Sequence, residues 1–62
     1  MLERIGKVYE FKTGCSVAEC KYYTGIEYRY GWYVFYPNGL TREFNSYDDA
    51  AEHAKHYVPE AN

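Results

Sequence analysis

The segment YPNGL at residues 36–40 constrains the fold of this chain most strongly, because it predicts a hairpin turn of a defined type. An Asn-Gly pair is typical of a two-residue type I′ turn, but the ladder beside that turn would need an N–H group at Pro37, which proline lacks. A type I turn instead places Pro37 at its second position and Gly39 in the left-handed conformation of a three-residue loop. We therefore predict the type I turn, with Tyr36 opposite Leu40 in the ladder.

This register sorts the residues of the hairpin onto two faces. Side chains alternate along a strand, so one face is apolar apart from Arg42 and carries Trp32, Val34, Tyr36, Leu40 and Phe44. The opposite face carries Tyr33, Phe35, Thr41 and Glu43. The type I′ register would shift one strand by a residue and mix the two sets. The turn that suits Pro37 is therefore also the turn that gives a continuous apolar face.

Three further segments predict strands before this turn. The segments IGKVYEF at residues 5–11 and VAECKYY at residues 17–23 are rich in strand-forming residues. A Thr-Gly turn signal at residues 24–25 separates the second of them from IEYRYGWYVFY at residues 26–36, which is long for one strand. Gly31 within that segment predicts a bulge or a bend rather than a break.

The segment NSYDDAAEHAKHYVP at residues 45–59 predicts a helix. Ser46 is a suitable N-cap, and Asp48 and Asp49 place negative charge in the first turn, where it suits the helix dipole. Spacings of three and four residues form one apolar stripe, made of Tyr47, Ala50, Ala51, Ala54, Tyr57 and Val58. Pro59 is expected to end the helix.

These elements predict an α+β fold, namely an antiparallel sheet of three to four strands with one C-terminal helix packed on one face. The 62 residues are expected to form a single small domain over residues 1–62. A chain of this length buries only about 60% of the surface that its unfolded form exposes, so its stability alone is marginal. A second subunit would supply additional burial.

The unusual feature of the composition is its aromatic content, which is 21% and includes nine tyrosines. One helix can cover only one face of the sheet. A domain this small therefore cannot bury all of these aromatic rings. We expect the open face to carry Tyr33, Phe35, Tyr28 and Tyr30 and to mediate self-association, because exposed aromatic surfaces are typical of interfaces. The chain is accordingly predicted to be a homodimer.

The charge pattern argues against nucleic acid as the main partner. The net charge is −2, whereas nucleic-acid-binding domains usually carry a basic face. An alternative function is nevertheless a small nucleic-acid-binding module in which sheet tyrosines act together with Arg29, Arg42 and Lys21. No apolar run approaches the length of a membrane span, so we expect a cytoplasmic protein with reduced cysteines.

Cys15, Cys20, His53 and His56 are the candidate metal ligands. Their spacings, C-x4-C and H-x2-H with 32 residues between the pairs, do not match those of zinc fingers. The expected arrangement is a buried Cys20, a loop Cys15 and two solvated histidines, although the sequence leaves open whether these four residues bind a metal. No cofactor is predicted.

An enzyme is not expected. The Asp49–His53 and Glu52–His56 spacings are those of carboxylate–histidine pairs, but ordinary pairing on a helix surface explains them equally well. The sequence also has no glycine-rich phosphate loop and no nucleophile elbow.

Residues 32–55, a tight hairpin followed by FNSYDDAAEHA, are similar to the strand-strand-helix unit of AP2-type integrase arm-binding domains. The basic residues with which such domains bind DNA are sparse here, which argues against that activity. The same segment, continued to YVP, also resembles small phage proteins that inhibit host RNA polymerase. This resemblance covers less than half of the chain and rests on residues common to many small α+β proteins, so no family is assigned.

The sequence therefore predicts a non-enzymatic, homodimeric, protein-binding module. Small acidic proteins of this kind can serve a phage as inhibitors of a host enzyme or defence complex. The predicted contact for a basic partner surface is the acidic helix face formed by Asp48, Asp49 and Glu52.

Overall fold

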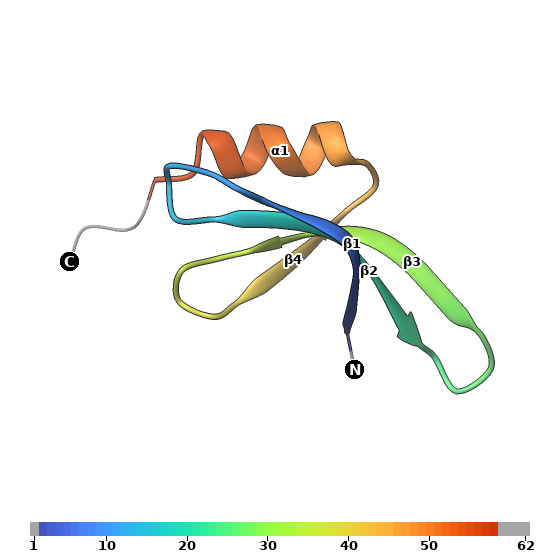
Figure 1. The fold of residues 1–62 in the computed structure, drawn as a ribbon. Coiled ribbons are helices and arrows are strands. Elements are labelled where there is room, and N and C mark those ends of the chain that lie inside the picture. The colour runs from blue at the N-terminus through green and yellow to red at the C-terminus, as the bar shows by residue number, and fades with distance from the viewer. Residues whose placement is uncertain (1, 59–62) are drawn as a thin grey trace.

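The computed structural model describes residues 2–58, which form four strands and one helix (Figure 1). The elements are β1 (Glu3–Glu10), β2 (Ser16–Tyr23), β3 (Tyr28–Phe35), β4 (Thr41–Phe44) and α1 (Tyr47–Lys55). The strands are antiparallel and lie in the order β1-β2-β3-β4, and α1 covers one face of one half of the sheet. The predicted α+β fold class is confirmed.

The turn between β3 and β4 is the three-residue loop that Pro37 favours. The Tyr36 N–H donates to the Leu40 carbonyl at 2.8 Å, and the Gly39 N–H donates to the Tyr36 carbonyl at 3.0 Å. Gly39 has a φ of +90°, which favours glycine. The ladder continues with Val34 opposite Arg42, as predicted from the sequence.

The loop between β1 and β2 has the same construction. The Phe11 N–H donates to the Cys15 carbonyl at 2.9 Å, and the Gly14 N–H donates to the Phe11 carbonyl at 3.0 Å. Gly14 has a φ of +92°. The two loops lie against each other, because a Cβ atom on Gly14 would be 3.0 Å from the Cγ atom of Pro37. The sheet therefore has two similar turns packed together at one end.

The core lies between α1 and the half of the sheet nearest these two loops. Its buried centre consists of Cys15, Val17, Val34, Ala50 and Ala54. Partly buried rings surround this centre, contributed by Tyr9, Phe11, Trp32, Tyr36, Phe44, Tyr47 and Tyr57. Alanine on the helix allows its axis to come close to the sheet, and the Thr13 hydroxyl donates to the Ala54 carbonyl at 2.7 Å. Cys15 lies in the loop between β1 and β2, as expected from the sequence, but its side chain is buried in the core.

The helix begins as predicted and ends earlier than predicted. The Ser46 hydroxyl caps it by accepting a hydrogen bond from the Asp49 N–H at 3.2 Å. The last helical residue is Lys55, so Val58 falls beyond the helix and is exposed rather than part of the buried stripe. Leu40 is also exposed, because it lies in the loop just before β4 begins. Pro59 lies outside the described residues.

The irregularity of the sheet is in β1 and not at Gly31. The register between β1 and β2 shifts between Ile5 and Val8, where Gly6 has a φ of +77°. The ladder between β2 and β3 passes through Gly31 opposite Cys20 without a shift. The bulge considered for Gly31 is therefore wrong, and the prediction that Gly31 does not break the strand is confirmed.

Candidate functional site

The hairpin of β2 and β3 extends beyond the helix, as Figure 1 shows. We call its far part, residues 20–31, the distal arm. The molecule is elongated, with extents of 41 × 23 × 16 Å. Its radius of gyration of 12.0 Å exceeds the roughly 11 Å expected of a compact domain of this length. The distal arm is therefore a protruding part of the surface.

Most of the exposed aromatic residues lie on this arm. Exposed fractions are 54% for Tyr23, 55% for Tyr28 and 60% for Tyr30, and Ile26 at the tip is 88% exposed. The rings of Tyr23 and Tyr28 are 5.1 Å apart between centroids, and the Nζ atom of Lys21 lies 5.0 Å from the Tyr28 centroid. Cross-strand pairing places Lys21 beside Tyr30 and Tyr23 beside Tyr28 on one face. We call these four residues the distal tyrosine face.

This arrangement corrects the predicted open face. Tyr28 and Tyr30 alternate with Arg29 and share the face of Trp32, which carries the helix farther along the sheet. Tyr33 lies on the opposite face. Only a bulge at Gly31 could have brought these tyrosines to one face, and that bulge is absent because the register is continuous.

The open face, moreover, is largely covered by its own side chains. Ala18 and Cys20 are fully buried there, and Tyr33 is only 8% exposed. Arg4 pairs with Cys20, and its guanidinium carbon lies 4.8 Å from the ring centroid of Phe35. Because Phe35 is on the far side of β2 from Arg4, that side chain must cross the small residues of β2. Fewer apolar atoms of this face are therefore available to a partner than the sequence predicted.

The pKa of the Tyr33 hydroxyl is raised, first by burial and then by the negative charge of its cross-strand neighbour Glu43. The folded state therefore favours the neutral phenol. The resulting stabilisation is fully present below the unfolded pKa of about 10, and it is lost as the pH rises through the folded pKa. We expect the free energy of unfolding in urea to fall above about pH 10, and to fall less steeply in Tyr33→Phe. Equal slopes for the two proteins would contradict this assignment.

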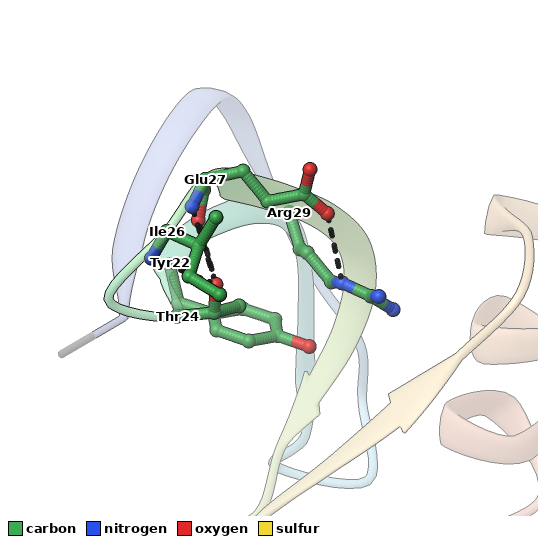
Figure 2. A pocket seen from close by; sticks show the side chains of 5 residues that line it. All are labelled: Tyr22, Thr24, Ile26, Glu27 and Arg29. Carbon is green, nitrogen blue, oxygen red and sulfur yellow. Dashed lines mark hydrogen bonds and ion pairs between the residues drawn. The ribbon is translucent and has the colours of Figure 1, made fainter.

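An open hollow lies at the tip of the distal arm. It has a volume of about 490 Å³ and is lined by Tyr22, Thr24, Ile26, Glu27 and Arg29. Figure 2 shows the Thr24 hydroxyl directed at the Glu27 carbonyl, to which it donates at 3.1 Å. The Thr24 hydroxyl also accepts from the Ile26 and Glu27 N–H groups at 3.4 and 3.3 Å. The tip is thus a turn ordered by one threonine.

The Arg29 side chain lines one side of this hollow and extends away from it. Its Nε atom is 3.6 Å from the Glu27 carboxylate, and both side chains are exposed. Figure 2 shows the guanidinium pointing away from the turn, beyond the β3 ribbon. Such exposed pairs contribute little to stability, so Arg29 can readily exchange Glu27 for another carboxylate.

The acidic helix face forms a second candidate surface. Asp48, Asp49 and Glu52 are all exposed, and two of them line an open hollow of about 450 Å³. The hollow is bounded by Glu43, Phe44, Asn45, Asp49, Glu52 and His53. Asp48 is not among its lining residues. Glu43 also lines this hollow, but its carboxylate lies over Gly31 on the opposite face of the sheet.

His53 is packed against the sheet and is not the solvated residue expected from the sequence. Its Nε2 atom is 2.7 Å from the Tyr36 hydroxyl, and its ring centroid is 5.1 Å from that of Phe44. His56 is exposed, with its Nε2 atom 3.9 Å from the Glu52 carboxylate. The imidazoles of His53 and His56 therefore lie in different surroundings, although the two residues are only three positions apart.

The two cysteines are separated as well. Both are buried free thiols, with Cys15 in the core beneath the helix and Cys20 on the open face. Burial raises the pKa of the Cys20 thiol. Within residues 2–58, no group of three or more His, Cys, Asp or Glu side chains is placed to hold a metal ion.

The three basic residues of the alternative function do not form one stripe. Lys21 belongs to the distal tyrosine face, whereas Arg29 alternates to the other face of the arm. Arg42 lies on β4, with its guanidinium carbon 5.1 Å from the Phe44 centroid. A strand of nucleic acid would have to pass around an edge of the sheet to contact all three.

Comparison of the chain with protein-family models, curated protein sequences and solved structures found no significant match. In the part of the chain that the structure describes, the helix is too short and too polar to span a membrane.

Proposed function

We propose that this chain is a non-enzymatic protein-binding module whose main contact surface is the distal tyrosine face. The supporting observation is that exposed Tyr23, Tyr28 and Tyr30 lie side by side on an arm that the helix does not cover. Small soluble domains rarely expose contiguous apolar surface, so a surface of this kind indicates an interaction site.

The chemistry of the arm fits a protein partner. Tyrosine supplies a large rigid contact area with a polar tip and loses little conformational entropy on binding. Lys21 lies against the Tyr28 ring, and the Glu27–Arg29 pair lies on the other face of the same arm, so the arm carries charge of both signs, as the rim of a protein interface does. The acidic helix face, formed by Asp48, Asp49 and Glu52, serves in this proposal as a second contact for a basic partner surface.

Self-association, if it contributes to this function, is better assigned to the distal tyrosine face than to the open face. Tyr33 is buried and Phe35 is stacked under Arg4, whereas the rings of Tyr28 and Tyr30 are exposed. Inhibition of a partner enzyme is one role that such a module can fill, because a small protein that covers a functional surface blocks it.

A photo-crosslinking experiment tests the proposal. A photoreactive phenylalanine analogue is introduced at Tyr30, and at the exposed Lys12 as a matched control. In cells that produce the protein, we expect a crosslinked partner from residue 30 and none from residue 12. The Tyr28→Ser/Tyr30→Ser variant should weaken partner binding by at least about tenfold with an unchanged melting temperature. Equal crosslinking from both positions would contradict the proposal, and a product of twice the chain mass would identify self-association.

The second candidate function is binding of single-stranded nucleic acid. One observation favours it, namely the Lys21 ammonium over the Tyr28 ring with Tyr30 beside it, which is a small stacking platform. This function predicts that oligonucleotide affinity falls steeply with salt. A titration that shows no binding at low salt would exclude it.

A further inference from the structure

We propose that the outer edge of β3, from Tyr28 to Gly31, binds an extended segment of a partner protein as an added antiparallel strand. This inference deepens the proposed function and rests on it, because it specifies how the distal arm would hold a protein partner. It begins from a difference in strand length. β3 has eight residues and β4 has four.

The difference in length leaves half of the β3 edge open. Phe44, the last residue of β4, pairs with Trp32. Asn45 and Ser46 then lead the chain away into α1, since Ser46 is already the helix cap. Among residues 2–58, no strand pairs with β3 on this side before Trp32.

The backbone groups at this edge can be assigned from the two flanking turns. In an antiparallel ladder, alternate residues direct both N–H and C=O toward the same neighbour. The Tyr36 N–H donates to Leu40, on the β4 side, so residues at even spacing from Tyr36, including Tyr30 and Tyr28, face that side. At the other turn, the Thr24 N–H donates to Glu27.

That second turn gives the same assignment independently. It makes the residue pair 24/27 hydrogen-bonded, so the pairs Tyr22/Arg29 and Cys20/Gly31 are hydrogen-bonded too. Arg29 and Gly31 are thereby used by β2. Tyr28 and Tyr30 present their N–H and C=O groups outward at the open edge.

This edge also lacks most of the features that usually protect an edge strand from pairing. Natural edges are blunted by proline, by bulges or by charged side chains, especially lysine. Residues 28–31 contain no proline, their register is regular, and Arg29 is their only charged residue. An exposed regular edge next to exposed rings is the arrangement used for strand addition, in which the backbone gives affinity and alternate side chains give specificity.

The side chains beside the edge define what the partner segment should contain. Residues of the added strand opposite Tyr28 and Tyr30 would lie on the tyrosine face and should be apolar. The residue between them would lie beside Arg29 on the other face and should be acidic. Opposite Gly31 a second acidic residue is disfavoured, because the Glu43 carboxylate lies over Gly31. The segment is therefore an apolar–acidic–apolar stretch with a single carboxylate.

The same edge of a second copy of this chain does not satisfy these requirements. In a symmetric antiparallel pair, the central residue lies opposite its own copy, and opposite residues lie on the same face of the shared sheet. On this edge, the central residue can be Arg29 or Tyr30. The first register places two Arg29 side chains directly opposite each other, which is repulsive. The second places Tyr28 opposite Trp32, whose edge is already occupied by Phe44. Pairing of this edge with itself is therefore unfavourable, and the occupant that we propose is a different protein.

Amide exchange measured by NMR tests the inference directly. In the protein alone, we expect the amides of Tyr28 and Tyr30 to exchange at least about tenfold faster than those of Arg29 and Gly31, because only the latter are paired with β2. The probe is a labelled Thr-Val-Glu-Val-Thr peptide, added at increasing concentration. Saturable binding that slows exchange at Tyr28 and Tyr30 by about tenfold would support strand addition.

Three controls make the test specific. The same peptide with N-methylated valines should not bind, because it has lost the strand-pairing N–H groups. Arg29→Glu should weaken binding of the Glu peptide by about fivefold, and a Lys peptide should restore it. No binding by the unmethylated peptide, or binding without protection of the two amides, would overturn strand addition. Crosslinking of a natural partner at residue 30 in that case would leave the proposed function standing.

Discussion

Replacing Ala54 by leucine is expected to lower the free energy of unfolding by about 2 kcal/mol, the middle of the range for an overpacked core. Ala54 is fully buried beneath the helix, in the cluster that contains Cys15, Val17 and Val34. The Thr13 hydroxyl holds the Ala54 carbonyl at 2.7 Å, so the last turn of α1 cannot move away from the sheet without breaking that bond. The larger side chain must displace either the helix or the β1–β2 loop.

Urea unfolding followed by tryptophan fluorescence measures this effect, because Trp32 lies against the core. Ala51→Leu is the matched control. It adds the same atoms to the same helix at a partly buried position and should change the free energy of unfolding by less than about 1 kcal/mol. Equal effects at the two positions would show that Ala54 does not set the distance between helix and sheet.

Gly14→Ala is expected to destabilise the fold by about 2 kcal/mol through two separate causes. The φ of +92° is unfavourable for any residue with a Cβ atom, and that atom would lie 3.0 Å from the Cγ atom of Pro37. Gly39→Ala meets only the first cause, since a Cβ atom there would have no neighbour within 4 Å. Its cost should be nearer 1 kcal/mol.

Pro37 allows the two causes to be separated. Pro37→Ala alone should cost little, and in the double variant with Gly14→Ala it removes the ring atoms that the new Cβ meets. The double variant should therefore be destabilised less than the sum of the two single variants when urea midpoints are compared. If Gly14→Ala and Gly39→Ala cost the same and the double variant is additive, contact between the two loops has no energetic role.

The features that were predictable from sequence are those decided by local chemistry. Pro37 and Gly39 together admit one turn, and that turn fixes the register of β3 and β4. Ser46 likewise marks the start of the helix. In each case the deciding residues lie within a few positions of the structure they determine.

The features that were missed depend on which residues are brought together from a distance. The loop before Cys15 repeats the construction of the Pro37 loop, but Lys12 and Thr13 carry no comparable turn signal. The bulge lies in β1 near Gly6 rather than at Gly31, since the ladder partners of a glycine decide whether its flexibility is used. Without that knowledge, Tyr28 could not be assigned to a face.

The candidate surfaces show the same division. That the tyrosines exceed what the domain can bury followed from composition, whereas their gathering on the distal arm followed from the shortness of β4. The end of β4 could be predicted in part from the sequence, because a helix cap at Ser46 leaves no room for a longer strand after Phe44.

The order β1-β2-β3-β4 also has a consequence for synthesis of the chain on the ribosome. Every strand pairs only with strands adjacent in sequence, and each connection is short. Loop closure is therefore inexpensive at each step, and each hairpin can form as soon as its second strand has emerged. The distal arm is complete in this sense before the helix has been translated, so the open edge of β3 exists while the core is still uncovered and exposed to the same cellular proteins.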